Sequence, residues 1–210
     1  MTNILVVAAV PQELRDFRFK TDSRLQCLVT GMGPRAGEAV RQRLAAGGIS
    51  LVVSTGFAGG VRPGFEVGDL VMASEVIHAS SGDRSRPDSP CFDLGGLASV
   101  GPFVTVEQVL AGPGEKAEAG TRFGAIAADM ESAAVAQAAE QAGVAWMAVR
   151  AILDPMEVTL SIRSRAQALR CLAAPKRWKE LSGFLKNIRT ASRSLAEGLH
   201  CLIERRERWI

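Results

Sequence analysis

Residues 51–71 read LVVSTGFAGGVRPGFEVGDLV, two apolar runs separated by glycines and turn residues. The branched run at Leu51–Thr55 is typical of a buried strand, and it leads directly into Gly56–Gly60. A second apolar, branched run follows at Asp69–His78. Glycines that directly follow a buried strand let backbone N–H groups approach a ligand. This stretch therefore predicts both part of a sheet and a binding loop.

Similar apolar runs occur on both sides of this stretch, and segments of helical character separate them. Further strands are expected at Asn3–Ala9, Leu25–Thr30, Ser99–Val106, Phe123–Ala128 and Ala145–Ile152. Helices are expected after Pro11, over Arg35–Ala46 and over the Ala-rich Met130–Ala142. This alternation favours an α/β fold with a mostly parallel, mixed central sheet flanked by helices.

Length and composition suit one globular domain. The chain has 210 residues, of which 47% are hydrophobic, so we predict a single domain over 1–210. The four cysteines show no spacing typical of metal ligands, and we expect no metal. The apolar run near the N-terminus is short and has no basic start, so we read it as a strand and expect a cytoplasmic protein. Ser80–Gly96 is rich in Ser, Gly, Pro and Asp and is expected to be a surface loop.

Charge is distributed unevenly along the chain. Residues 161–210 carry a net charge of +8 and residues 1–160 carry −5, which gives the total of +3. Over Lys176–Ile210, leucines near helical spacing alternate with basic residues, which predicts one long amphipathic helix. Such a helix could lie on an anionic membrane at the inner face, or it could pack on the domain with its charges in water. Its basic residues are not interleaved with aromatic ones, so we expect no nucleic-acid partner.

Three acidic residues each lie just past an apolar run that is predicted to be a strand: Glu13, Glu131 and Asp154. Ligands of open α/β sheets bind beyond the carboxyl ends of the strands, so these carboxylates could converge on one cleft. Each acid also has a structural explanation. Acids in a first helical turn favour the helix dipole, and Asp-Pro is a common turn signal. The residues alone leave both explanations open.

Five segments occur in a characteristic order: ILVVAAVPQEL, TGMGP, VVSTGFAGGVRPGFEVGDLV, AIAADMESAAVAQAA and VRAILD. Together they resemble the nucleoside phosphorylase superfamily over about residues 1–155. The chain is most similar to bacterial nucleosidases that act on methylthioadenosine and adenosylhomocysteine, and to their hopanoid-associated and futalosine-hydrolysing relatives. The resemblance implies cleavage of the N-glycosidic bond of an adenine-type purine nucleoside without a metal or organic cofactor. It also implies a homodimer, for which the apolar residues Phe65 and Val67 are a plausible contact.

For catalysis, the resemblance points to Glu13 and Asp154. Asp154 matches the residue that protonates the purine at N7, and Glu13 matches the acid that holds and activates the attacking water. A purine leaves poorly as an anion, and general acid catalysis contributes about 10²–10⁴-fold in rate. Asp154 must then keep a proton near neutral pH, which requires burial or a hydrogen-bonding partner.

For substrate binding, the resemblance points to five further residues. Glu131 matches the acid that binds the ribose hydroxyls, and Met130 lines the sugar. Ala58 and Gly59 lie in the loop beneath the sugar and nucleophile. Val109 falls near the position of an aromatic residue that stacks on the base. A carboxylate that holds the 2′- and 3′-hydroxyls would orient the sugar and stabilise its growing positive charge.

The nucleophile can be water or phosphate. Phosphorylases of the family have an Arg near the first turn and an Arg and a Ser around the glycine segment, where this chain has Glu13, Ser54 and Phe57. An acid repels phosphate, so we expect water. Phosphorolysis with phosphate as co-substrate is the alternative, because the hopanoid-associated relatives are usually called phosphorylases and Arg35 could supply positive charge. A non-catalytic nucleoside-binding protein is a third possibility, since fold does not fix function.

Overall fold

Eight strands form one mixed sheet in the part of the chain that the computed structural model describes, residues 3–17, 24–33, 35–87, 94, 96–160 and 182–205. The strands are β1 (Ile4–Ala8), β2 (Leu25–Val29), β3 (Leu51–Gly60), β4 (Leu70–His78), β5 (Arg84–Ser85), β6 (Ala98–Thr105), β7 (Ala127–Asp129) and β8 (Ala145–Asp154). Their order is β2-β1-β3-β7-β6-β4-β5, and β8 pairs with both β3 and β4. Antiparallel pairing is confined to β3–β7, β4–β5 and β4–β8 among these strands, so the prediction of a mostly parallel, mixed sheet is confirmed.

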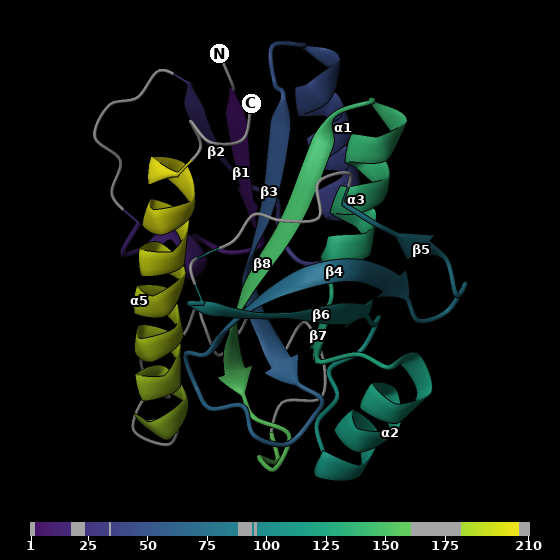
Figure 1. Ribbon diagram of the computed structural model, residues 1–210, viewed down its shortest axis with the longest axis vertical. Coiled ribbons are helices and arrows are strands. Elements are labelled where there is room, and N and C mark those ends of the chain that lie inside the picture. Colours follow the sequence, from purple (N-terminus) through teal and green to yellow (C-terminus); the bar gives the residue numbers. More distant parts are fainter. Residues whose placement is uncertain are drawn as a thin grey trace.

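Helices cover both faces of this sheet. They are the 3-10 turn η1 (Pro11–Leu14) and the α-helices α1 (Arg35–Ala45), α2 (Pro113–Phe123), α3 (Ser132–Gln141) and α5 (Ser182–Glu204). Figure 1 shows α1 and α3 on one face of the sheet, α5 along the opposite face, and α2 near one end of the sheet, where it contacts β6 and β7. The predicted α/β fold with a long C-terminal helix is confirmed.

Alternate residues of β1 bury the two faces of the sheet. Leu5 and Val7 belong to the core under α1 and α3, whereas Ile4 and Val6 belong to the core under α5. All four side chains are at most 2% exposed. Successive strand residues point to opposite faces, so a strand that is covered on both sides needs a continuous apolar run. This requirement explains the uninterrupted apolar character of the first strand.

The segment Gly56–Gly60 is part of a strand, and its prediction as a loop is wrong. Parallel pairing of β3 with β8 continues to Gly59, and Gly59 and Gly60 also pair with β7. The extra pairing partners become available only in the folded sheet, so the local run of apolar residues did not indicate them. The consequence is that the glycines stand on a rigid strand at the edge of the site.

Helix α2 was not predicted from the sequence. Its start has clear signals, with Pro113 at the first helical position and Glu115 at the third, and Gly124, whose φ is +65°, caps its end. Glu115 accepts hydrogen bonds from the backbone N–H groups of Ala111 (2.7 Å) and Gly112 (3.1 Å). The Gly- and Pro-rich start obscured the helical pattern. Residue Phe123, which was expected to begin a strand, therefore ends a helix instead.

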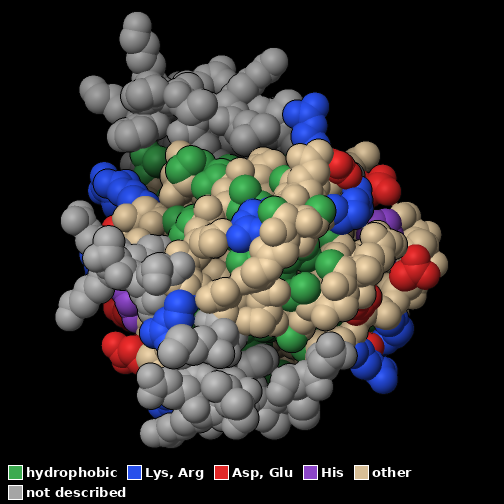
Figure 2. Space-filling model, turned by 90° about the horizontal axis from the view of Figure 1, so that it is seen from above, with side chains coloured by type: hydrophobic (Ala, Val, Ile, Leu, Met, Phe, Trp, Pro, Cys, Tyr) green, Lys and Arg blue, Asp and Glu red, His purple; other side chains and the backbone are tan. Residues whose placement is uncertain are grey.

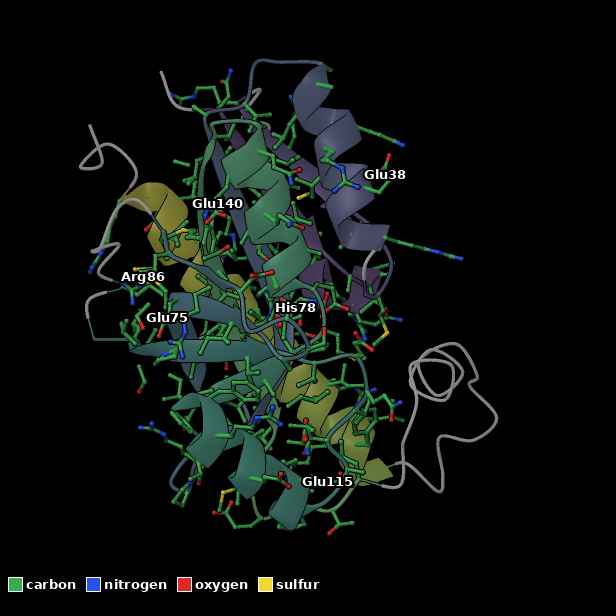
Figure 3. The ribbon with its side chains drawn as sticks, turned by 90° about the vertical axis from the view of Figure 1, so that its right-hand side faces the viewer. Glu38, Glu75, His78, Arg86, Glu115 and Glu140 are labelled. Atoms are coloured by element: carbon green, nitrogen blue, oxygen red, sulfur yellow. The ribbon has the colours of Figure 1, made fainter. Side chains whose placement is uncertain are left out.

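The segment predicted as a surface loop contains the short strand β5, which pairs antiparallel with the end of β4. Glu75 on β4 binds Arg84 and Arg86 with N–O distances of 2.8 Å and 3.3 Å. Figure 3 shows Glu75 and Arg86 beside each other. Residues 88–93 and 95 lie outside the described part of the chain.

The C-terminal helix packs on the sheet. The described helix α5 lies within the predicted range, of which residues 176–181 and 206–210 lie outside the described part. Its apolar face is buried, and the residues concerned are Ile188, Ala191, Leu195, Leu199 and Leu202. Basic residues of the helix such as Lys186 and Arg193 are exposed. The structure thus favours a packed helix over one that inserts this apolar face into a membrane.

Two further observations concern membranes and polyanions. In the described part of the chain, no helix is both long and apolar enough to cross a bilayer. In the end view of Figure 2, the described Lys and Arg side chains lie at several separate places, in some of them beside Asp or Glu side chains. On the described part of this face they form no continuous basic stripe of the kind that binds a polyanion.

Candidate active site

A pocket lies where the carboxyl ends of β3, β7 and β8 meet the turn η1. All seven residues that the sequence singled out line it, namely Glu13, Ala58, Gly59, Val109, Met130, Glu131 and Asp154. These residues come from segments far apart in the sequence. Glu13 and Asp154 meet near the carboxyl ends of the parallel strands β1, β3 and β8, as the rule for open α/β folds predicts, whereas Glu131 follows β7, which runs antiparallel to β3. Lys116 of α2 and Phe184 of α5 also line the pocket, and sequence reasoning had assigned neither of them a role.

Glu13 is held in place by backbone N–H groups. Its Oε2 accepts hydrogen bonds from Ala9 (2.8 Å) and Val10 (3.1 Å), and its Oε1 accepts one from Phe57 of β3 (3.0 Å). The side chain is only 6% exposed. Burial raises the pKa of the Glu13 carboxyl, while these hydrogen bonds and the nearby Arg150 oppose the increase. The result is an oriented carboxyl group whose proton affinity is increased, as a general base requires.

Glu131 lies at the start of α3 and reaches toward the glycine turn after β2. Its Oε1 accepts a hydrogen bond of 2.7 Å from the backbone N–H of Gly33. Burial raises the pKa of Glu131 to about 7, and the neighbouring Asp129 and Glu13 add to this increase. The side chain is partly exposed to the pocket, so it can accept hydrogen bonds from hydroxyl groups of a ligand.

Asp154 ends β8 and forms an ion pair with a buried lysine. Its Oδ2 lies 2.7 Å from Nζ of Lys116, whose side chain is 0% exposed. Nζ of Lys116 also donates to the backbone oxygens of Pro155 (2.8 Å) and Val158 (2.9 Å). Burial raises the pKa of Asp154 to about 6, although Lys116 favours the ionised form. At pH 7 about a tenth of Asp154 then carries a proton, far more than of an aspartate with the usual pKa.

A buried polar cluster supports the floor of the pocket. Arg150 contacts Asp129 at 2.8 Å and donates to the hydroxyl oxygens of Ser54 (2.9 Å) and Ser132 (2.8 Å). Asp129 also accepts hydrogen bonds from the hydroxyl groups of Thr105 and Ser132. Arg150 is 1% exposed, and a buried guanidinium requires such partners. The positive charge of Arg150 is therefore paired with Asp129 within the protein, and Arg150 is absent from the described lining of the pocket.

The remaining described lining of the pocket is mostly apolar. It includes Val106, Val109, Leu110, Leu160 and Phe184. Phe184 brings the C-terminal helix into the wall of the pocket. In the sequence this aromatic residue resembled any other apolar position of an amphipathic helix, so only the packing identifies it. Within the described ranges, no group of three or more His, Cys, Asp and Glu side chains could hold a metal ion.

The fold is similar to that of several solved nucleosidases. A methylthioadenosine/adenosylhomocysteine nucleosidase from Neisseria meningitidis, in complex with methylthio-immucillin-A, has a TM-score of 0.74 at 19% identity, covering 97% of this chain and 99% of that chain. The corresponding nucleosidase from Helicobacter pylori has a TM-score of 0.71 at 14% identity, covering 97% of this chain and 98% of that chain. An adenosylhomocysteine nucleosidase from Streptococcus pyogenes has a TM-score of 0.68 at 19% identity, covering 93% of this chain and 95% of that chain. At these identities the likeness shows the fold.

A comparison with sequence families identifies the family. No curated protein sequence matches the chain significantly. The family model for the phosphorylase superfamily matches residues 14–93 and 89–174, which together make up most of the chain. These two segments include the glycine-rich strand β3, the start of α3 and the end of β8. The chain belongs to the phosphorylase superfamily.

Proposed function

We propose that the protein hydrolyses the N-glycosidic bond of an adenine-type purine nucleoside and releases the base. The observation that carries this proposal is one pocket that contains the carboxyl groups of Glu13, Glu131 and Asp154, each with a raised pKa. A pair of carboxyl groups with altered proton affinities is suited to general acid and general base catalysis.

Asp154 acts as the general acid. It donates its proton to N7 of the purine while the electrons of the C1′–N9 bond move into the base. The purine then leaves as a neutral molecule, and Asp154 remains as a carboxylate beside Lys116. The burial that raises the pKa of Asp154 supports this role, because the carboxyl group must be protonated when the substrate binds.

Glu131 and Met130 hold the sugar. In its ionised form, Glu131 accepts hydrogen bonds from the 2′- and 3′-hydroxyl groups, and its fixed contact with Gly33 sets the orientation. Negative charge next to the ribose stabilises the oxocarbenium-like state that forms as the base departs. Ala58 and Gly59 have no large side chain, which leaves space beneath the sugar.

Glu13 acts as the general base. It accepts a proton from water as the water oxygen forms a bond to C1′. The products are the free base and a sugar with a hydroxyl group at C1′. Three backbone hydrogen bonds fix the carboxylate, and its increased proton affinity favours uptake of this proton.

The charges around the pocket favour water over phosphate. Lys116 is the one Lys or Arg among the described residues that line the pocket, and its three donors already have acceptors. Arg35 is exposed and is not among those residues. A phosphate ion would instead meet Glu13 and Glu131, which repel it when they are ionised. Phosphorolysis is the alternative, and it would give a sugar 1-phosphate.

The apolar wall formed by Leu110, Leu160 and Phe184 supports a substrate with an apolar group on the sugar. The similar structures are nucleosidases whose names specify methylthioadenosine and adenosylhomocysteine, and one holds methylthio-immucillin-A. Methylthioadenosine is therefore the first substrate to test. We also propose a homodimer, since two-fold dimers are the commonest assembly, and light scattering at micromolar concentration checks it.

An assay of purine release tests the proposal. Methylthioadenosine, adenosylhomocysteine, adenosine and inosine are each incubated with the enzyme, with and without phosphate. The expected result is release of adenine at a rate that phosphate does not change. Binding of a nucleoside without turnover would instead indicate the non-catalytic binding protein.

A further inference from the structure

We propose that Lys116 is a positioning residue for Asp154: its ammonium group holds the carboxyl group at the end of β8 and stabilises the carboxylate that remains after the proton has passed to the purine. This role rests on the proposed function, in which Asp154 is the general acid. The segment that carries Lys116 lies outside the motifs that suggested the other site residues, so the role is inferred from the geometry.

The contacts of Lys116 leave its ammonium group no freedom. An ammonium group has three N–H donors. They meet Oδ2 of Asp154 at 2.7 Å and the backbone oxygens of Pro155 and Val158 at 2.8 Å and 2.9 Å. Lys116 therefore fixes both the carboxyl group and the turn that follows it. The ammonium has no donor left for a ligand, which makes it a fixed positive charge rather than a proton donor to the substrate.

Helix α2 holds Lys116 rigidly. The start of this helix is fixed by Glu115, labelled in Figure 3, which accepts hydrogen bonds from Ala111 and Gly112. The backbone N–H of Leu160 donates to the oxygen of Ala111 at 2.8 Å. The chain after Asp154 is thus tied back to α2 at a second point. Movement of the charge away from Asp154 would require several of these bonds to break.

Among the charged groups around Asp154, Lys116 acts most directly on its carboxyl group. Glu13, Asp129 and Glu131 line the same pocket, and Arg150 is paired with Asp129 beneath it. Of the described charged groups, Lys116 is the one in contact with the Asp154 carboxyl. In the reaction, the O–H bond of Asp154 breaks and the N7–H bond of the purine forms. A cation beside the new carboxylate favours that transfer, but it also lowers the fraction of Asp154 that is protonated at rest.

These two effects differ in their dependence on pH, which gives a direct test. Lys116→Met removes the charge, and we expect the pKa of Asp154 to rise by about one unit, the lower end of the effect of a neighbouring charge. The ratio of kcat/KM of the variant to that of the wild type should then increase about tenfold between about pH 5 and about pH 8. The ratio is informative because titrations common to both proteins cancel. A purely structural role predicts a reduced ratio that does not change with pH, and that result would overturn the proposal.

Two controls distinguish the proposed role of Lys116 from a nonspecific loss of activity. Lys186→Met removes the same charge from an exposed position on α5, and its ratio to the wild type should stay near one at every pH. The leaving group of a nitrophenyl riboside is nitrophenolate, which departs without being protonated. With this substrate the ratio for Lys116→Met should be independent of pH, and a pH-dependent ratio would contradict the role of Lys116 in proton transfer.

Folding is checked by circular dichroism, and Lys116→Gln is made alongside because its amide can still donate to the backbone oxygens. If neither variant folds, Lys116 is needed for the fold as a whole and the proposal is overturned. If the wild type cleaves no nucleoside, the proposed function fails, but the ion pair between Lys116 and Asp154 can still be tested through the thermal stability of the protein. Above about pH 6, the thermal midpoint of Lys116→Met should fall more steeply than that of the wild type, and Asp154→Asn should abolish this difference. Persistence of the difference in the Asp154→Asn background would contradict the pairing.

Discussion

A Cβ atom at Gly56 would lie 2.6 Å from Oε1 of Glu13. Gly56 also has a φ of +151°, a conformation that residues with a side chain rarely adopt. The carboxylate of Glu13 thus rests directly against the backbone of β3, where it accepts the hydrogen bond from Phe57. The glycine therefore permits the contact that holds the proposed general base.

Gly56→Ala should displace Glu13 and reduce activity more than it reduces stability. A displacement of about 1 Å at a catalytic group can cost about 10²-fold, and we expect a loss of that order in kcat/KM. Gly64→Ala is the matched control, because Gly64 also has a positive φ, +92°, and its Cβ would meet no atom within 4 Å. Steady-state kinetics and thermal unfolding of both variants give the comparison. Wild-type activity in Gly56→Ala would show that the position of Glu13 does not matter.

The pH dependence of kcat/KM should be bell-shaped. The active form needs Glu131 ionised, although its pKa is about 7, and Asp154 protonated, although its pKa is about 6, so it is a minor form of the enzyme. Below about pH 6 this form decreases because Glu131 becomes protonated and no longer accepts both ribose hydroxyls. Above about pH 7 it decreases because Asp154 has lost its proton. The rate should therefore be highest between these values. Glu131→Gln should flatten the acidic side of the profile, and an unchanged acidic side would refute this assignment.

The same carboxyl groups should make the protein less stable at high pH. A raised pKa means that the folded state holds the proton more tightly than the unfolded state, so this stabilisation is present at low pH and is lost as pH rises through the folded pKa. Glu131→Gln should thus increase the free energy of unfolding by the order of 1 kcal/mol at about pH 8, and by less at about pH 5. Glu118→Gln, at an exposed position of α2, is the control. Denaturant unfolding at both pH values measures the difference, and a Glu131→Gln protein that is less stable at high pH would contradict the expectation.

Helix α5 should contribute to stability through its buried face. Leu199 is fully buried in the core that also contains Leu202 and Met147, and Leu199→Ala should cost about 2–5 kcal/mol. Arg193→Ala, on the exposed side of the same helix, should change stability little. Chemical denaturation measures both. An unchanged stability of Leu199→Ala would mean that this face does not hold the fold and would favour the membrane-bound helix.

The central sheet and the acidic residues were predictable because they depend on local patterns. Continuous apolar runs indicate strands that are buried on both faces, and each of Glu13, Glu131 and Asp154 directly follows such a run. The rule that ligands bind at the carboxyl ends of parallel strands then accounts for Glu13 and Asp154, because β1 and β8 run parallel to β3. Glu131 follows β7, which runs antiparallel to β3, so the rule does not account for its place in the site. The end of β3 was missed because its pairing with β7 and β8 depends on the assembled sheet.

Lys116 and Arg150 could not be assigned from the sequence for a related reason. A lone lysine in a Gly- and Pro-rich segment resembles an exposed residue, and its burial is caused by contacts with Asp154 and the turn after it. Arg150 lies within a segment that resembles the family, but its three side-chain partners, Asp129, Ser54 and Ser132, come from separate elements. Buried charges are stable only with such partners, and partners that lie far apart in sequence become visible only in the fold.

The proton donor can be tested by Asp154→Asn, which keeps the shape of the side chain and removes the acid. Release of adenine from methylthioadenosine should fall by at least about 10²-fold, the usual contribution of a general acid. The activity of the variant toward a nitrophenyl riboside, whose leaving group needs no proton, should fall much less. Circular dichroism verifies that the variant is folded. A near-wild-type rate with the purine substrate would rule out the proposed role of Asp154.

Identifying the sugar product tests most directly whether water or phosphate attacks C1′. The wild-type enzyme is incubated with methylthioadenosine in buffer with and without phosphate, adenine is quantified by chromatography, and the sugar is examined by phosphorus and proton NMR. If the enzyme is a hydrolase, equal amounts of adenine and free methylthioribose form at a rate that phosphate leaves unchanged. A sugar 1-phosphate as the main product, formed only when phosphate is present, would contradict hydrolysis.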